Sequence, residues 1–271
     1  MTQVQLTALQ MSSRPDPQDN LAIVAKLLEQ LPAARPQLVV LPEAFSCFGA
    51  GDRAQLAMAE PYKDGEVQKR LAALAKKHEV YLVGGTLPVD AGERFSAASI
   101  LFGPDGAILN RYDKIHLFDI TLSAKKSYRE SATVHGGQTA VICQTPLGCF
   151  GHTICYDLRF PHLYRDLSQS GAEILFVPAA FTKKTGEAHW HVLNRARAIE
   201  NGAFVVAPCA IGRVEGGGES YGHSLIINPW GEILADGGAD SGFINVNINL
   251  EEVNSARTRI PSLSHDRAFE F

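Results

Sequence analysis

Two kinds of apolar pattern alternate along this chain of 271 residues. Residues 38–43, 80–88 and 172–181 are short apolar runs of the kind that form buried strands. Between them, residues 17–31 and 188–202 repeat their apolar side chains at helical spacing. An alternation of strands and helices predicts an α/β fold, in which helices cover the faces of a sheet.

Hairpin patterns interrupt this alternation. Turn-forming residues at 103–106, 145–148 and 228–231 each separate two strand-like stretches. Antiparallel hairpins inside an alternating chain indicate a mixed sheet or two stacked sheets. Because no linker-like or low-complexity stretch divides the sequence, we expect one domain over residues 1–271.

Composition excludes several classes of protein. The formal net charge of −4 offers no basic field for nucleic acid, and no apolar run is long enough to span a membrane. The N-terminus alternates Val4, Leu6 and Ala8, which predicts a first strand rather than a secretory signal. Five scattered cysteines without CxxC spacing argue against a disulfide framework and against a zinc cluster. We therefore expect a cytoplasmic protein with reduced thiols.

Three chemically active side chains stand where predicted strands end. Glu43 closes an apolar run, Lys114 follows a strand pattern, and Cys155 closes another run shortly before Pro161 opens a helix. A strand that turns sharply into a helix presents its last side chain at the sheet edge where α/β proteins bind ligands. A thiol in that position becomes nucleophilic when a base or a cation activates it. These three residues are therefore candidates for a catalytic site.

Simpler interpretations of the same residues stay open at this point. A buried structural thiol would account for Cys155, and satisfied ion pairs would account for the two charged residues. His152 lies at odd spacing from Cys155 on its strand, and His189 and His191 do not share a helix face, so none is an evident base for the thiol. Ser123–Lys126 fits S-x-x-K, but the accompanying motifs of serine enzymes are absent from the sequence.

Three ordered blocks carry a resemblance to a known family. They are LPEAF around Glu43, DKIHLFD around Lys114 and GHTICYDLRFP around Cys155. Along nearly its whole length the chain resembles the nitrilase, or carbon–nitrogen hydrolase, superfamily. The resemblance implies a four-layer α-β-β-α sandwich without a metal or a cofactor. It also implies a glutamate base, a lysine that stabilises the tetrahedral intermediate, a cysteine nucleophile, and a second glutamate that matches Glu130.

This resemblance implies hydrolysis of a small-molecule carboxamide to an acid and ammonia through a thioester. The backbone amide of Tyr156 would join Lys114 in binding the oxyanion. Arg159 would either pair with a substrate carboxylate or serve as a structural partner of Asp157. Phe181 and Thr182 match the family's pocket-lining segment.

The second half of the chain resembles the branch that contains deaminated glutathione amidases and omega-amidases. Ser220–Ser224 lacks the tryptophan-containing insertion typical of omega-amidases, which favours a deaminated glutathione amidase. Alternatives are an omega-amidase acting on α-ketoglutaramate or α-ketosuccinamate and a non-catalytic binding module. Residues 121–127 depart from the family pattern beside the pocket, so they leave the substrate open. The family also implies a homodimer, with the tail 260–271 at its interface.

Overall fold

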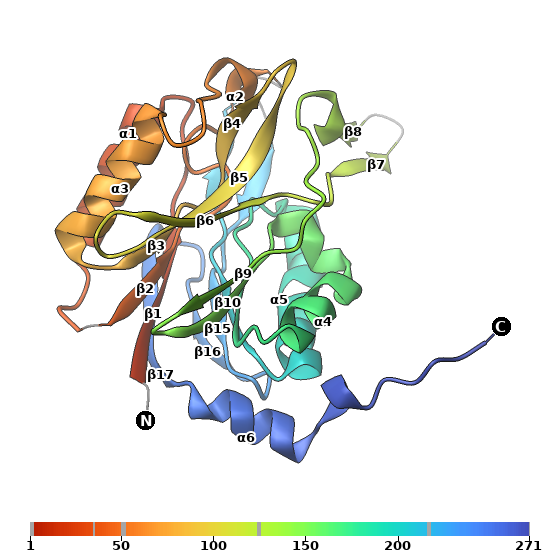
Figure 1. The fold of residues 1–271 in the computed structure, drawn as a ribbon. Coiled ribbons are helices and arrows are strands. Elements are labelled where there is room, and N and C mark those ends of the chain that lie inside the picture. Colours follow the sequence, from red (N-terminus) through yellow and green to blue (C-terminus); the bar gives the residue numbers. More distant parts are fainter. Residues whose placement is uncertain (1–2, 35, 50–52, 124–125, 216–217, 271) are drawn as a thin grey trace.

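The computed structural model describes residues 3–34, 36–49, 53–123, 126–215 and 218–270 (Figure 1). One sheet has the strand order β17-β1-β2-β3-β5-β4, with β6 paired to β5. Its strands are β1 (Gln3–Gln10), β2 (Gln37–Val40), β3 (Tyr81–Val83), β4 (Leu87–Ala91), β5 (Arg94–Phe102), β6 (Ile108–Asp113) and β17 (Gly242–Asn249). β1, β2 and β3 are parallel, and the remaining pairings are antiparallel, so the sheet is mixed.

The second sheet has the order β16-β15-β12-β11-β10-β9. Its strands are β9 (Ile142–Thr145), β10 (Gly148–His152), β11 (Ile174–Phe176), β12 (Phe204–Ala207), β15 (Leu225–Ile227) and β16 (Ile233–Asp236). Two small hairpins lie outside both sheets: β7 (Asp119–Ser123) with β8 (Lys126–Arg129), and β13 (Ile211–Arg213) with β14 (Glu219–Tyr221).

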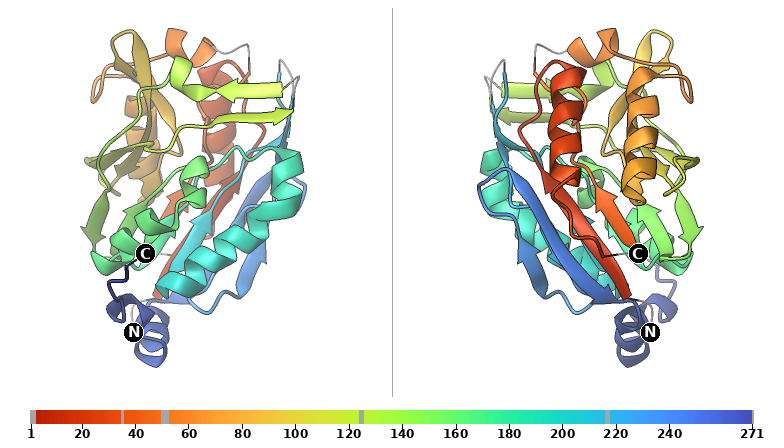
Figure 2. Two further views of the ribbon diagram at one scale, coloured as in Figure 1. Left: turned by 90° about the vertical axis from the view of Figure 1, so that its right-hand side faces the viewer. Right: turned by 90° about the vertical axis from the view of Figure 1, so that its left-hand side faces the viewer.

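Helices cover the outer face of each sheet. α1 (Pro17–Leu28) and α3 (Glu66–His78) lie on the first sheet, and α4 (Pro161–Gln169) and α5 (Lys183–Asn201) lie on the second, on the opposite side of the molecule (Figure 2). The inner faces of the two sheets share one apolar layer, in which Leu6 and Val40 belong to the same buried cluster as Phe176 and Val206. The expected four-layer α-β-β-α sandwich is confirmed.

Local signals set several element boundaries. Asp16 caps α1 by accepting a hydrogen bond from the Gln18 backbone N–H at 2.8 Å, with Pro17 at the first helical position, as predicted. Gly202 ends α5 in a left-handed conformation with φ +51°, which glycine adopts without a Cβ penalty. The helix predicted for residues 188–202 begins earlier, at Lys183, after Thr182 in extended conformation.

The single strand predicted for residues 80–88 is wrong. β3 ends at Val83, and Gly84-Gly85 separates it from β4. Gly85 has φ +51°, and a Cβ there would lie 2.0 Å from the Pro42 carbonyl oxygen. The chain breaks its strand at this point because only glycine permits so close an approach to the backbone that precedes Glu43.

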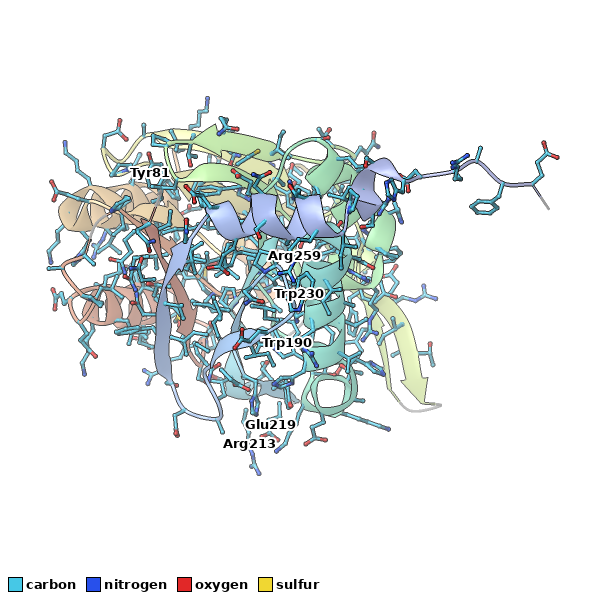
Figure 3. The ribbon with its side chains drawn as sticks, turned by 90° about the horizontal axis from the view of Figure 1, so that it is seen from below. Tyr81, Trp190, Arg213, Glu219, Trp230 and Arg259 are labelled. Atoms are coloured by element: carbon cyan, nitrogen blue, oxygen red, sulfur yellow. The ribbon has the colours of Figure 1, made fainter. Side chains whose placement is uncertain are left out.

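The C-terminal segment leaves the body of the protein. α6 (Glu251–Arg259) and the short helix η3 (Ser262–Ser264) follow β17, and the chain then extends outward (Figure 1; seen from below in Figure 3). Arg165 of α4 binds Asp266, and Gln169 donates to the Leu263 carbonyl at 2.8 Å. These contacts fasten the start of the tail to α4. None of the helices in the described ranges has the length and hydrophobicity that a membrane span needs.

His152 on β10 supports a prediction about acid stability. The ring is fully buried between apolar side chains, and neither ring nitrogen has a hydrogen-bond partner among the described residues. Burial lowers the pKa of His152 to about 3. Between that value and the unfolded value near 6.5, the unfolded chain binds a proton that the folded chain does not, so stability falls as pH falls.

In the wild type, protonation of His152 in the unfolded chain should lower the free energy of unfolding by up to about 1.4 kcal/mol for each pH unit below pH ~6. We expect His152→Phe to remove this contribution to the pH dependence. Urea unfolding of wild type and variant at pH 5 and pH 7.5 measures it. His135→Phe, a change of an exposed histidine, is the control and should keep the wild-type pH dependence. Equal pH dependence of His152→Phe and wild type would contradict the prediction.

Candidate functional site

Cys155 occupies a strained turn directly after the second sheet. β10 ends at His152, and the helix η2 (Cys155–Arg159) begins three residues later. Cys155 has φ +44°, a left-handed conformation that costs a non-glycine residue energy. Its backbone N–H donates to the Pro178 carbonyl at 2.9 Å, which fixes the turn beside the segment that follows β11. The Cys155 side chain is thereby held at the sheet edge and is 8% exposed.

A fully buried carboxylate stabilises this turn. Asp157 Oδ2 accepts the Ile154 backbone N–H at 2.8 Å and the Tyr112 hydroxyl at 2.7 Å. Its Oδ1 lies 3.0 Å from the His116 backbone nitrogen and 2.7 Å from His116 Nδ1. Since β6 ends next to Lys114, these bonds connect the Cys155 turn of the second sheet to the Lys114 region of the first.

Lys114 lies between two carboxylates. Its Nζ donates to Glu43 Oε1 at 2.8 Å and to the two carboxylate oxygens of Glu130 at 2.8 and 2.9 Å. The Lys114 side chain is 2% exposed. Burial disfavours the ammonium, but the carboxylates of Glu130 and Glu43 outweigh it and raise the pKa of Lys114 well above its ordinary value. The amine is therefore a permanent cation at neutral pH.

Backbone donors orient both glutamates. Glu43 Oε2 accepts the Ala180 N–H at 2.8 Å, and Glu130 Oε2 accepts the Phe118 N–H. Glu43 itself lies on a short loop after β2, where the Ala44 N–H donates to the Thr86 hydroxyl at 2.7 Å. Each carboxylate is thus held by Lys114 and by one backbone amide, which together fix its orientation.

The Cys155 thiol interacts with both Glu43 and Lys114. Burial raises the pKa of Cys155 well above its ordinary value, and the Glu43 carboxylate, which is hydrogen-bonded to the thiol, raises it further. The Lys114 ammonium lowers this pKa but does not offset those effects. The resting site accordingly holds a neutral thiol beside the Glu43 carboxyl group and the Lys114 ammonium. Such a set can pass a proton from sulfur to carboxylate when an electrophile arrives.

The structure brings Glu43, Lys114, Glu130 and Cys155 together. Three of them follow strands of the two sheets, and Glu130 begins the short helix η1 (Glu130–Ala132). The Tyr156 amide lies in the first turn of η2, where a backbone N–H has no acceptor within its own helix.

The residues expected to contact substrate differ in their surroundings, and Arg159 lies against aromatic rings. The Arg159 guanidinium lies 5.3 Å from the centre of the Phe181 ring and 6.0 Å from that of Tyr156. The alternative that pairs Arg159 with Asp157 is wrong, because the bonds of Asp157 go to Tyr112, His116 and Ile154. No carboxylate pairs with Arg159 in the described part of the chain.

The other two residues predicted to contact substrate, Phe181 and Thr182, make contacts within the protein. Phe181 is buried and packs on Trp190, with ring centres 5.0 Å apart. The Thr182 hydroxyl is 2.8 Å from the Thr185 hydroxyl, within the first turn of α5. The unusual segment 121–127 spans the end of β7 and the start of β8, and its residues 124–125 lie outside the described residues.

Two supporting groups are not among the predicted site residues. The sequence suggests Asp157 only as a partner for Arg159, and the Ala180 amide is not predicted. The signal for Asp157 was its position two residues after the nucleophile candidate, where an acidic side chain can accept backbone N–H groups of a tight turn. A backbone donor such as Ala180 leaves no mark in the sequence.

Comparison with known proteins places this site in context. A family model described as carbon–nitrogen hydrolase matches residues 5–258. The chain is 40% identical over 264 residues to a deaminated glutathione amidase from Synechocystis sp., a match covering 95% of this chain and 96% of that protein. It is 34% identical over 270 residues to the omega-amidase NIT2 of Homo sapiens, covering 99% of this chain and 96% of that protein.

Solved structures agree with these matches. Nit3 of Saccharomyces cerevisiae, a member of branch 10 of the nitrilase superfamily, superposes with a TM-score of 0.88 at 31% identity, covering 99% of this chain and 97% of Nit3. The NitFhit protein of C. elegans superposes with a TM-score of 0.91 at 33% identity. That match covers 98% of this chain but 66% of the longer worm protein.

Asp157 supplies a prediction about the turn. Its two carboxylate oxygens serve four donors, whereas an asparagine has one oxygen and would direct an NH₂ group at the others. We expect Asp157→Asn to lower the free energy of unfolding by about 3 kcal/mol, because a buried network loses its acceptors. Chemical denaturation measures this loss.

Asp64→Asn is the matched control. Asp64 is an exposed carboxylate paired with Lys69 at 2.6 Å, and its substitution should leave the free energy of unfolding unchanged within the error of the measurement. If the two variants were equally stable, Asp157 would not hold the turn.

Proposed function

This chain belongs to the carbon–nitrogen hydrolase family, and we propose that it cleaves a small-molecule amide with Cys155 as nucleophile and Glu43 as general base. The observation that supports this assignment is the buried Lys114 ammonium, shared between Glu43 and Glu130 beside the Cys155 thiol. A metal ion is not needed for this chemistry, because the nucleophile, base and cation are all side chains of the chain itself.

The first half of the reaction forms an acyl-enzyme. Glu43 removes the proton from Cys155 Sγ as the sulfur attacks the amide carbonyl carbon, and a tetrahedral intermediate forms. Lys114 and the Tyr156 amide donate hydrogen bonds to its oxyanion. Loss of one such donor typically lowers the rate 10²–10³-fold, which corresponds to about 3 kcal/mol. Glu43 then gives its proton to the amide nitrogen, and the C–N bond breaks. The amine departs, and the acyl group remains on Cys155 as a thioester.

Water completes the cycle. Glu43, ionised again, takes a proton from a water molecule as that water attacks the thioester carbonyl. The second tetrahedral intermediate uses the same oxyanion donors. Its collapse breaks the C–S bond, the Cys155 sulfur recovers the proton from Glu43, and the carboxylic acid is released. Glu130 holds the Lys114 ammonium in place throughout, so we assign it a positioning role.

We propose a substrate of the deaminated glutathione type. The similarity to deaminated glutathione amidases supports it, at 40% and 36% identity over most of each protein. In glutathione the glutamate side chain is joined to the amine of cysteine, so cleavage of that amide releases a dipeptide amine rather than ammonia. A primary amide, the omega-amidase type of substrate, would release ammonia through the same steps.

Arg159 is our candidate for recognising the substrate's carboxylate. It is a half-buried guanidinium held against two aromatic rings near Cys155, without a carboxylate partner among the residues that the structure describes. A guanidinium binds a carboxylate through two parallel hydrogen bonds. Phe181 and Thr182 would form the adjoining wall of the pocket.

We further propose that residues 1–271 form one domain that assembles as a homodimer in the cytoplasm. Large apolar side chains are exposed near the tail, among them Val192, Ile199, Trp230 and Ile260. Figure 3 shows Trp230 beside α6, where Arg259 lies 4.6 Å from the centre of its ring. A second subunit would cover these side chains and receive the extended tail. Five free cysteines fit a reducing compartment.

Removing the nucleophile tests the reaction. We expect Cys155→Ala to lower kcat by at least about 10⁴-fold with the fold intact, because no other group can form the thioester. The assay follows release of the carboxylic acid by chromatography from deaminated glutathione, α-ketoglutaramate, α-ketosuccinamate and a simple aliphatic amide.

Cys143→Ala is the matched control, since Cys143 is half-buried on β9 of the second sheet, outside the site. Its activity should equal that of wild type. Turnover by Cys155→Ala at the wild-type rate would refute the mechanism. Wild-type preference for α-ketoglutaramate would make the enzyme an omega-amidase with the same mechanism.

Arg159 gives a separate prediction about specificity. We expect Arg159→Gln to lower kcat/KM for substrates that carry a carboxylate by about 10–100-fold, from loss of a charge-assisted pair worth roughly 1.5–3 kcal/mol. Turnover of the uncharged aliphatic amide should change only a few-fold. Lys183→Gln, which removes an exposed cation paired with Glu219, is the control. An equal loss on charged and uncharged substrates would mean that Arg159 supports the fold instead.

A further inference from the structure

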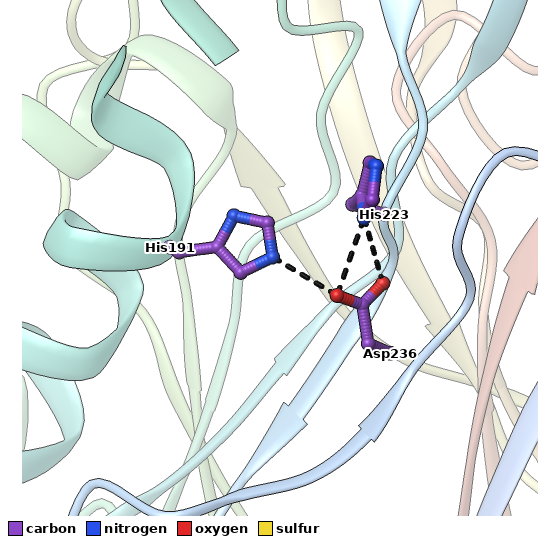
Figure 4. A group of neighbouring side chains, drawn as sticks. All are labelled: His191, His223 and Asp236. Atoms are coloured by element: carbon purple, nitrogen blue, oxygen red, sulfur yellow. Dashed lines mark hydrogen bonds and ion pairs between the residues drawn. The ribbon is translucent and has the colours of Figure 1, made fainter. Parts of the chain in front are cut away.

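Two histidines and an aspartate converge on the surface away from Cys155. His191 comes from α5, His223 from the segment between β14 and β15, and Asp236 from the end of β16 (Figure 4). His191 Nε2 lies 3.0 Å from Asp236 Oδ2, and His223 Nδ1 lies 2.9 and 3.2 Å from the two Asp236 oxygens. One ligand atom from each residue falls within 4.8 Å of the others.

We propose that His191, His223 and Asp236 bind a divalent transition metal ion of the zinc type. Zinc binds histidine nitrogen and carboxylate oxygen at about 2.0–2.2 Å in tetrahedral geometry, which separates neighbouring ligand atoms by roughly 3.3–3.6 Å. The separations of 2.9–3.2 Å around Asp236 need to open by a few tenths of an ångström, and the two histidine nitrogens lie within 4.8 Å of each other. Rotations of the two partly exposed imidazole rings would adjust these distances when the ion binds.

The donor set selects the class of ion. Imidazole nitrogens suit zinc, copper and nickel, whereas calcium and magnesium prefer oxygen ligands throughout. The side chains of all three residues are about one-third exposed, at 30%, 30% and 33%. The ion would therefore reach them from solvent, and water would fill its remaining coordination position.

The surrounding structure holds the ligands in place. The His223 backbone N–H donates to the Gly238 carbonyl at 2.8 Å, and its carbonyl accepts the Trp190 indole N–H at 2.7 Å. Asp236 Oδ1 accepts the Gly238 N–H at 2.8 Å, and the Tyr221 ring stacks on His223 with centres 4.6 Å apart. Such outer contacts lower the cost of ordering the ligands when a metal binds.

A metal ion here would fasten α5 to the second sheet. In its absence Asp236 accepts hydrogen bonds from both histidines, and these are weaker links than metal coordination. Trp190, which holds the His223 carbonyl, also packs on Phe181. The ion would therefore stabilise the same end of α5 that carries the wall of the Cys155 pocket, without taking part in the reaction.

Zinc binding by the full chain tests this proposal. Tag-free protein is stripped with a chelator and titrated with Zn²⁺ in competition with a chromophoric chelator, and thermal unfolding is recorded with and without Zn²⁺. We expect one Zn²⁺ per chain and an increase in Tm. His191→Ala and Asp236→Asn should each weaken binding at least about 10-fold and abolish the Tm increase. Asparagine keeps an acceptor for the histidines, so this variant separates coordination from hydrogen bonding.

Two controls identify the binding residues. His135→Ala alters an exposed histidine elsewhere and should bind Zn²⁺ as wild type does. Cys155→Ala should also bind normally, because the proposed ligands exclude the thiol. The proposal is overturned if His191→Ala binds Zn²⁺ as tightly as wild type, if only Cys155→Ala loses binding, or if wild type binds none.

Discussion

The candidate site depends on one buried cation. Lys114 carries a charge in surroundings from which water is almost excluded, and isolated burial of such a charge would cost many kcal/mol. Two carboxylates on either side offset that cost, and each is fixed by its own backbone donor. Removing Lys114 leaves two neighbouring carboxylates without their shared cation, and removing either glutamate leaves the ammonium with one partner, so the ion pairs, the pKa of Lys114 and the position of the thiol form one interdependent unit.

The two packed sheets hold the charged groups and the thiol at the positions that the ion pairs require. Lys114 and Glu43 follow strands of the first sheet, whereas Cys155 and the Ala180 amide belong to the second. The apolar layer between the sheets sets their separation and thereby the distance from carboxylate to thiol. Asp157 adds a polar connection across the same boundary through Tyr112 and His116. The packing between the sheets consequently also determines how the reacting groups are aligned.

Sequence patterns predicted most of the architecture because they record local physics. The first strand, the Asp16 cap of α1 and the left-handed Gly202 all follow from periodicity or from capping chemistry. The break at Gly85 was missed because its cause is the carbonyl of Pro42, far away in the sequence. The three blocks around Glu43, Lys114 and Cys155, and the matching Glu130, were recognisable by resemblance. The bonds of Asp157 to His116 and Tyr112 span 41 and 45 residues, and the donor to Glu43 is a backbone N–H. The backbone donor has no signature in the sequence, and the position of Asp157 predicts its bond within the turn but not its distant partners Tyr112 and His116.

The protonated state of Cys155 has a consequence for chemical durability. Oxidants and electrophilic metabolites attack thiolates far faster than thiols, so enzymes that rest with an ionised cysteine depend on cellular repair systems. Here the proton stays on sulfur, and the narrow exposure of the side chain limits access further. Under the proposed mechanism, a reagent would inactivate this protein efficiently only if it first occupied the space of the amide and drew the proton toward Glu43. Durable covalent inhibitors of such a site must therefore resemble the substrate before they react.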